Sequence, residues 1–250
     1  FRGEDGAPAA MLDRCPHRAA PLSLGQCENG TIRCMYHGLR FDSAGQCVEV
    51  PGQTMTPRAL NVEVFPVVER DHLIWIWMGD ADLADPETIP DSSPHNGERS
   101  ARGGYIRYAA NYRLIADNLL DFSHLAFVHS ATLGTRDQAQ TKAVVEKFDG
   151  GVQVNFTTLG SKVPAFVKAA SRLPDRVDRF QNYRWHIRSC YFVQDSVIAP
   201  PGEDADTTDP IAFRNHTINV LTPETETSTH FFWSLAHSDF NPDEPNATEI

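Results

Sequence analysis

Cys15-Pro16-His17-Arg18 and Cys34-Met35-Tyr36-His37-Gly38 are the two stretches that decide the fold of the first part of this chain. In each stretch a Cys is followed within three residues by a His, and sixteen residues separate His17 from Cys34. Two thiolates and two imidazoles on two loops can close a zinc site, or they can hold a [2Fe–2S] cluster with two Cys on one iron and two His on the other. A zinc finger ordinarily places both Cys in one turn and both His on one helix. The spacing therefore favours the cluster over zinc, and over four unrelated buried side chains.

The composition limits the class of protein. The chain has 250 residues, enough for two domains, and 22 basic against 33 acidic residues give a net charge of −11. Such an acidic chain is a poor partner for nucleic acid or an anionic membrane. The sequence also contains no run of about 18 apolar residues, the length that a membrane-spanning helix needs. A small anionic substrate is still possible, since one Arg in a pocket would suffice. The first residues lack a secretory signal, so we expect a cytoplasmic protein whose clustered Cys residues bind metal.

The pattern of apolar residues and turns predicts two domains and a linker. Residues 1–80 are typical of short strands and turns, and residues 81–104 are rich in Asp, Pro, Ser and Gly, as linkers are. From residue 105 the pattern predicts a strand, then a helix over about 113–128. Further strands are expected over 143–148, 152–156, 191–198, 211–221 and 229–236, the first two forming a hairpin at Asp149-Gly150-Gly151. The second domain, 105–250, is therefore predicted to be α+β with a mostly antiparallel sheet.

A second group of metal-binding residue types lies on the predicted helix. Asp121 and His124 are three residues apart and share a helix face, whereas His124 and His129 are five apart. Five residues correspond to about 140° around a regular helix. Both His could bind one metal only if the helix ended or bulged between them, an irregularity that is common at functional sites. Taken alone, this spacing is a weak signal for a metal site.

Both groups of residues resemble one family. Cys15-Pro16-His17-Arg18 and Cys34-Met35-Tyr36-His37-Gly38 resemble the Rieske box of the aromatic-ring-hydroxylating oxygenases and related O-demethylases. The stretch 117–129 resembles the mononuclear iron motif of the same family and follows in the family's order. Residues 222–225 and 229–233 look like late strands of the vanillate and dicamba O-demethylase subgroup. The resemblance implies an all-β Rieske domain followed by a helix-grip-like catalytic domain.

The resemblance assigns the cluster ligands. Those that would hold the [2Fe–2S] cluster are Cys15, His17, Cys34 and His37. Cys27 and Cys47 lie outside both ligand loops, and we expect them to be small buried hydrophobic residues.

The resemblance also assigns the second metal site. His124 and His129 would be two ligands of a mononuclear non-haem Fe(II), and the third, a carboxylate on a later helix, is expected beyond Ile250. We accordingly expect both ends of the chain to be trimmed. Asp121 would bind no iron but would form the electron-transfer bridge between the two metal centres across a subunit interface, and Asn118 would lie near the iron.

The activity implied is that of a terminal oxygenase component. It would use O2, and electrons that come indirectly from NAD(P)H through a ferredoxin or a flavin/iron–sulfur reductase, to hydroxylate or O-demethylate a small aromatic substrate. A pocket is expected near Leu119, Phe122, Phe156 and Phe192, and a homotrimer is the expected assembly. The alternatives are a Rieske-type electron carrier without oxygenase chemistry of its own and a zinc-stabilised binding module.

Overall fold

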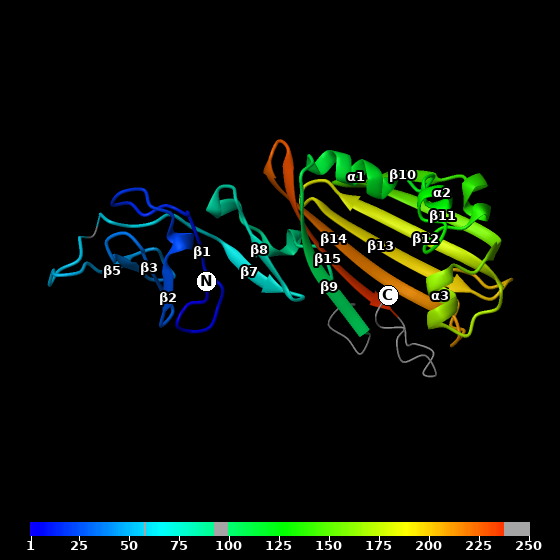
Figure 1. Cartoon of the computed structure of the whole chain (residues 1–250), viewed down its shortest axis with the longest axis horizontal. Helices are drawn as coiled ribbons and strands as arrows, with labels where there is room; N and C mark the ends of the chain where they lie inside the picture. Colours follow the sequence, from blue (N-terminus) through cyan, green and yellow to red (C-terminus); the bar gives the residue numbers. More distant parts are fainter. Residues whose placement is uncertain (58, 93–99, 238–250) are drawn as a thin grey trace. The chain divides into compact units, whose positions relative to one another are not determined.

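The computed structural model describes residues 1–57, 59–92 and 100–237. The chain divides into two compact units, Phe1–Asp91 and Ser92–Ile250, and the division falls within the range 81–104 expected to be a linker (Figure 1). Two single-turn 3₁₀ helices, η2 (Ala81–Leu83) and η3 (Pro86–Thr88), belong to the first unit, while residues 93–99 of that range lie outside the described residues. None of the described helices is both long and apolar enough to cross a lipid bilayer.

The first unit is built from short antiparallel strands, as the sequence predicts. One sheet has the order β2-β3-β4-β5, and two strand pairs are β1-β6 and β7-β8. The bounds are β1 Ala10–Met11, β2 Gln26–Glu28, β3 Thr31–Arg33, β4 Arg40–Phe41, β5 Cys47–Glu49, β6 Val64–Phe65, β7 Val67–Arg70 and β8 Leu73–Ile76, with a 3₁₀ turn η1 at Leu22–Leu24. Asn29 and Gly30, both with positive φ, connect β2 to β3, which is the backbone geometry that twisted hairpins favour.

The core of the first unit places two cysteines among apolar side chains. Phe41 is fully buried, and Leu22, Ile32 and Leu39 pack with it around Cys15 and Cys34. Cys47 is also buried, as expected, but Cys27 is exposed on β2, so the expectation that it is a buried hydrophobic residue is wrong. β2 pairs only with β3, and none of its three residues is buried.

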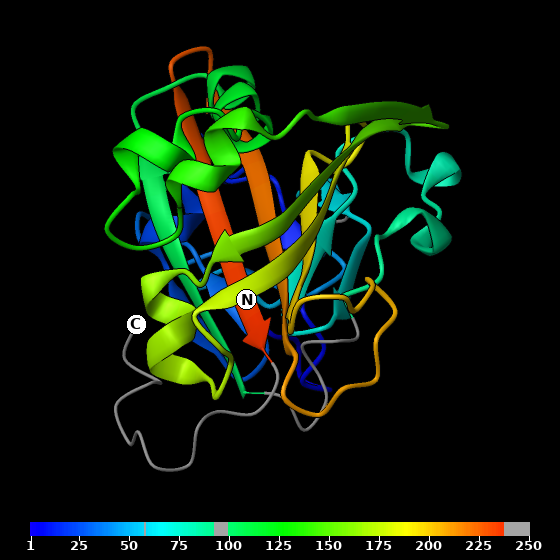
Figure 2. The same cartoon turned by 90° about the vertical axis from the view of Figure 1, so that its right-hand side faces the viewer.

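The second unit is a seven-stranded antiparallel sheet with the order β10-β11-β12-β13-β14-β15-β9. The bounds are β9 Ser100–Tyr108, β10 Val144–Phe148, β11 Gly151–Lys162, β12 Arg176–His186, β13 Tyr191–Ala199, β14 Phe213–Thr225 and β15 Ser228–His237. The predicted α+β class, antiparallel sheet and hairpin are therefore confirmed. Helices α1 (Tyr112–Leu120) and α2 (Leu125–Val128) lie together on one side of the sheet, and α3 (Ala165–Ala170) connects β11 to β12 (Figures 1 and 2).

The single helix expected over 113–128 is wrong, because the chain leaves helical geometry at Asp121. Asp121 has φ −92° and ψ 105°, and its Oδ1 accepts hydrogen bonds from the backbone N–H and the hydroxyl of Ser123 at 2.8 and 2.6 Å. Such a side-chain turn offers the backbone an alternative to the next helical hydrogen bond. A second short helix, α2, then begins after His124 and ends before His129.

Phe122 anchors this interrupted helix to the sheet. Its side chain is buried, with ring centroids 3.8 Å from Tyr183 and 5.1 Å from Phe156. An edge-to-face pair such as Phe122–Phe156 adds about 0.5–1.5 kcal/mol to the stabilisation from the area it buries. The residues on both sides of Phe122 are thereby held against the sheet.

Candidate functional site

The two Cys–His loops of the first unit repeat the same backbone hydrogen bonds. In the first loop the N–H of Cys15 donates to the carbonyl of Ala20 (2.8 Å) and the N–H of Ala19 donates to Cys15 (2.9 Å). In the second loop Cys34 donates to Leu39 (2.8 Å) and Gly38 donates to Cys34 (3.1 Å). Each Cys is thus presented at the start of an identical six-residue turn, a match that two unrelated loops would not be expected to share.

The four expected cluster ligands converge between these loops. Cys15 and Cys34 are each 2% exposed and carry free thiols, and the ring centroids of the exposed His17 and His37 are 4.6 Å apart. Burial and the adjacent Cys34 raise the pKa of the Cys15 thiol, while the backbone N–H groups of His17 and Arg18 act in the opposite direction. Two neighbouring thiols and two neighbouring imidazoles are the donor set of a Rieske [2Fe–2S] centre, so these residues fit that group.

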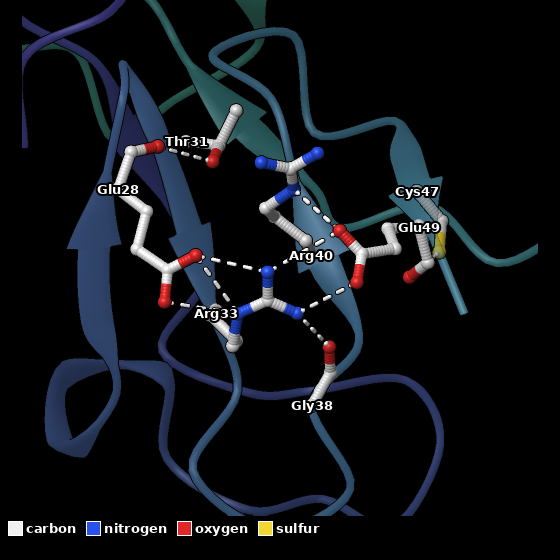
Figure 3. A network of polar contacts seen from close by, with 7 residues as sticks. All are labelled: Glu28, Thr31, Arg33, Gly38, Arg40, Cys47 and Glu49. Atoms are coloured by element: carbon white, nitrogen blue, oxygen red, sulfur yellow. Dashed lines mark hydrogen bonds and ion pairs between the residues drawn. The ribbon is translucent and has the colours of Figure 1, made fainter. Parts of the chain in front are cut away.

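Arg33 closes the second loop from outside, a role that sequence reasoning missed. Its Nη1 donates to the carbonyl of Gly38 at 2.9 Å, and the guanidinium also pairs with Glu28 (2.9 Å) and Glu49 (3.0 Å), as Figure 3 shows. These hydrogen bonds hold the pKa of Glu49 below its ordinary value. The signal in the sequence was no more than an Arg directly before Cys34, since Glu28 lies on the neighbouring β2 but Glu49 lies on β5, two strands from β3.

The equivalence of the two loops gives a test by exchange of Gly and Ala. Ala19 and Gly38 occupy the same loop position with φ 56° and 74°, and a Cβ on Gly38 would lie 3.0 Å from the Pro51 side chain. A left-handed L-residue costs about 1–2 kcal/mol. We expect Gly38→Ala to lower the free energy of unfolding of the first unit by about this amount and Ala19→Gly to raise it by about 0.5–1 kcal/mol. Urea titration with tryptophan fluorescence measures both, and effects of the same sign would contradict the equivalence.

In the second unit, His124 and His129 are brought together by the shortness of α2. They flank its single turn, and their ring centroids are 5.3 Å apart. The break that the five-residue spacing requires is therefore present. Nδ1 of His124 is buried and has no hydrogen-bond partner among the described residues, which is a costly arrangement unless another group binds there. Two such imidazoles fit two ligand positions of a mononuclear iron site.

Of the two further residues expected at this site, Asp121 interacts with His124, whereas Asn118 is placed only on α1. The hydrogen bonds from Ser123 are the largest cause of the lowered pKa of the Asp121 carboxyl group. The electrostatic interaction with His124 lowers this pKa further. Both Asp121 and Asn118 are exposed, and Asn118 lies on α1, before the break. Among the residues the structure describes, no cluster of three or more His, Cys, Asp or Glu could hold one metal ion.

Comparison with known proteins agrees with this arrangement. Residues 1–66 match the Rieske [2Fe-2S] domain family, and residues 108–250 match the vanillate O-demethylase oxygenase C-terminal domain family. The iron-sulfur subunit of the toluene-4-sulfonate monooxygenase system of Comamonas testosteroni is 40% identical over 257 residues, which cover 100% of this chain and 73% of that protein. The oxygenase component of dicamba O-demethylase from Stenotrophomonas maltophilia is 40% identical over 253 residues, covering 98% and 71%.

Solved structures agree as well. The crystal structure of dicamba monooxygenase bound to dicamba matches with a TM-score of 0.87 and 38% identity, covering 100% of this chain and 72% of that one, and a further structure of that enzyme contains non-haem iron. The expected family, fold and oxygenase activity are confirmed, whereas the electron-carrier and zinc alternatives find no support. With its Rieske [2Fe–2S] domain followed by a vanillate O-demethylase type C-terminal domain, this chain belongs to the oxygenase components of the Rieske non-haem iron monooxygenases and O-demethylases.

Proposed function

We propose that this oxygenase component hydroxylates or O-demethylates a methyl or methoxy group of an aromatic acid, with electrons from a ferredoxin or a flavin/iron–sulfur reductase in the cytoplasm. The observation that carries the proposal is the presence in one chain of the Cys–His loops and of the His124–His129 pair. The similarity to proteins named for toluene-4-sulfonate and dicamba supports an aromatic acid as substrate. A homotrimer remains part of the proposal.

Each set of residues has its own task. Cys15, His17, Cys34 and His37 would hold the cluster, and His124 and His129 would hold the mononuclear iron. When bound, these groups supply one-electron storage and O2 activation. Cys15 and Cys34 are buried, so water is kept away from their sulfur atoms. His17 and His37 are exposed, and an electron-transfer partner can reach them. The prediction that a carboxylate beyond Ile250 completes the iron site stays a prediction.

The function is tested with the whole protein, loaded with iron and supplied with NADH, a ferredoxin reductase and a ferredoxin under ¹⁸O2. Toluene-4-sulfonate, vanillate and dicamba are offered separately, and the expected result is an ¹⁸O-labelled hydroxymethyl product or formaldehyde. Iron analysis should give three irons per chain. Two irons per chain, with a reducible cluster and no product from any aromatic acid, would instead establish an electron carrier.

Asp121 is proposed to position the imidazole of His124, in addition to its expected bridging role. Carboxylates beside metal-binding His residues fix ring orientation, and their removal typically costs about 10–100-fold. We expect Asp121→Asn to reduce turnover by about this factor with the cluster spectrum and iron content preserved. Ser123→Ala, which removes the hydroxyl that Asp121 accepts from, is the matched control, because the carboxylate remains. Wild-type turnover in Asp121→Asn would dismiss the assignment.

A further inference from the structure

Arg179 is a buried cation on the sheet face that the metal-binding segment covers. It lies on β12 and is 3% exposed. Side chains at alternate strand positions share one face, so Arg179 lies on the same face as Gln181 and Tyr183. Tyr183 packs against Phe122, and Gln181 accepts a hydrogen bond from Gln138 (3.0 Å). This face of β12 is thus covered by residues 122–138, the segment that carries both His124 and His129.

The guanidinium of Arg179 has buried N–H groups without hydrogen-bond acceptors among the described residues. Its Nη2 donates to the carbonyl of Leu133 at 3.3 Å, whereas Nε and Nη1 are buried and have no hydrogen-bond partner within the described chain. No described carboxylate forms an ion pair with it. Burial lowers the pKa of Arg179 to about 10, so the side chain is still almost fully protonated at neutral pH. An unpaired buried charge of this kind destabilises the folded chain, and a bound anion would offset that destabilisation.

Short contacts connect Arg179 to the two histidines. Leu133, which accepts from Arg179, precedes Gly134, and the N–H of Gly134 donates to the carbonyl of His129 at 2.9 Å. Gly134 also lies so close to α2 that a Cβ on it would be 1.9 Å from the carbonyl oxygen of Leu125. The guanidinium is therefore held by the same backbone turn that fixes the end of α2.

Aromatic side chains lie on the same covered face. Phe122, Phe156 and Phe192 belong to one buried cluster with Tyr183, and Leu119 packs at its border. These include all four residues expected near the pocket. A cation with free N–H groups at the margin of an aromatic cluster suits a ligand that combines an aromatic ring with an anionic group.

We propose that Arg179 binds the sulfonate or carboxylate group of the aromatic substrate and thereby selects anionic over neutral aromatic compounds. This inference rests on the proposed function for the identity of the ligand. Nε and Nη1 donate charge-assisted hydrogen bonds to the anion, while Nη2 stays on Leu133. Arg179 is a specificity residue and takes no part in proton or electron transfer.

The test is a binding measurement that needs no turnover. The iron-loaded whole protein is titrated anaerobically by calorimetry with toluene-4-sulfonate and with its neutral analogue methyl 4-tolyl sulfone. We expect Arg179→Gln to weaken sulfonate binding by about 10–100-fold and to leave sulfone binding within about twofold. Arg179→Lys keeps the charge, and its affinity for toluene-4-sulfonate is expected to fall between those of the wild type and Arg179→Gln. The control is Arg176→Gln, since Arg176 begins the same strand but its side chain is 64% exposed and pairs with Asp137.

The outcomes separate this inference from its alternatives. If Arg179→Gln lowers the affinities for the sulfonate and the sulfone equally, Arg179 has a structural role and the proposal is overturned. A wild-type protein that binds both ligands equally would overturn it as well, and that is the result expected if a carboxylate of another segment or copy already pairs with Arg179. If Arg179→Gln does not fold, the wild-type preference for sulfonate and its reduction in Arg179→Lys decide the question. Sulfonate selectivity without turnover of any aromatic acid would defeat the proposed function alone, and turnover of acids unaffected by Arg179→Gln would defeat this inference alone.

Discussion

His124→Ala is expected to lower turnover by about 1,000-fold or more while the visible spectrum of the cluster stays intact. The reason is that the two sites occupy different units of the chain: His124 directly precedes α2 in the second unit, and the Cys–His loops belong to the first. Removal of one imidazole from the pair empties a ligand position without touching Cys15 or Cys34. Product formation and iron content per chain, measured on the same preparation, check the result.

The control for this variant is another His, one that lies in a different unit from His124 and outside both Cys–His loops. His72 is exposed in the turn between β7 and β8 and has φ 61°, a conformation that Asn tolerates. His72→Asn should retain full turnover and the full iron content. If His124→Ala retains both as well, His124 is not an iron ligand, and the unpartnered Nδ1 needs another explanation.

Cys34→Ala is expected to remove the cluster altogether, and with it all turnover. Cys34 is buried beside Cys15 in the core of the first unit, so its loss takes away one of two thiolates from one iron. Metal binding and folding are coupled, and the first unit should therefore also unfold at lower urea concentration. Loss of visible absorbance and of acid-labile sulfide measures the first effect, and tryptophan fluorescence in urea measures the second.

Cys27→Ala provides the matched comparison for Cys34→Ala. Cys27 lies on β2 in the same sheet but is exposed and outside both loops. It should retain the cluster, its colour and its turnover. A Cys34→Ala protein that still contains acid-labile sulfide in stoichiometric amount would refute the ligand assignment for this loop.

The candidate ligand sets could be located in the sequence because the proposed chemistry confines them to short segments. Cys15 with His17, and Cys34 with His37, each lie within one loop whose turn brings thiol and imidazole to the same end. The His124–His129 spacing required a helix end between the two residues, and α2 ends there, whereas the interruption at Asp121 precedes both residues and was not predictable. It depends on Asp121 accepting from Ser123, and Asp and Ser at that spacing also occur inside regular helices.

The residues that sequence reasoning missed depend on long-range pairing. β12 carries charged or amide side chains on both faces, so its alternation of apolar and polar residues is obscured, and no strand was predicted there. The burial of Arg179 could consequently not be predicted from the sequence. Its burial follows from pairing with Thr158 on β11 and Ile198 on β13, and from cover by a segment more than 40 residues earlier. The ion pair of Arg33 likewise depends on the fold, which brings Glu49, 16 residues later, beside its guanidinium.

The pairing of β9 with β15 has a consequence for biosynthesis. Tyr108 at the end of β9 pairs with Thr229, which leaves the ribosome 121 residues later. At about 5–20 residues per second, β9 waits roughly 6–24 s for its partner, with its backbone hydrogen-bonding groups unpaired. During that interval the growing sheet extends from β10 to β14 but cannot close on its first strand. The nascent second unit therefore leaves the backbone edge of β9 unpaired for that interval, and slower translation before Ser228 would lengthen the exposure of that edge.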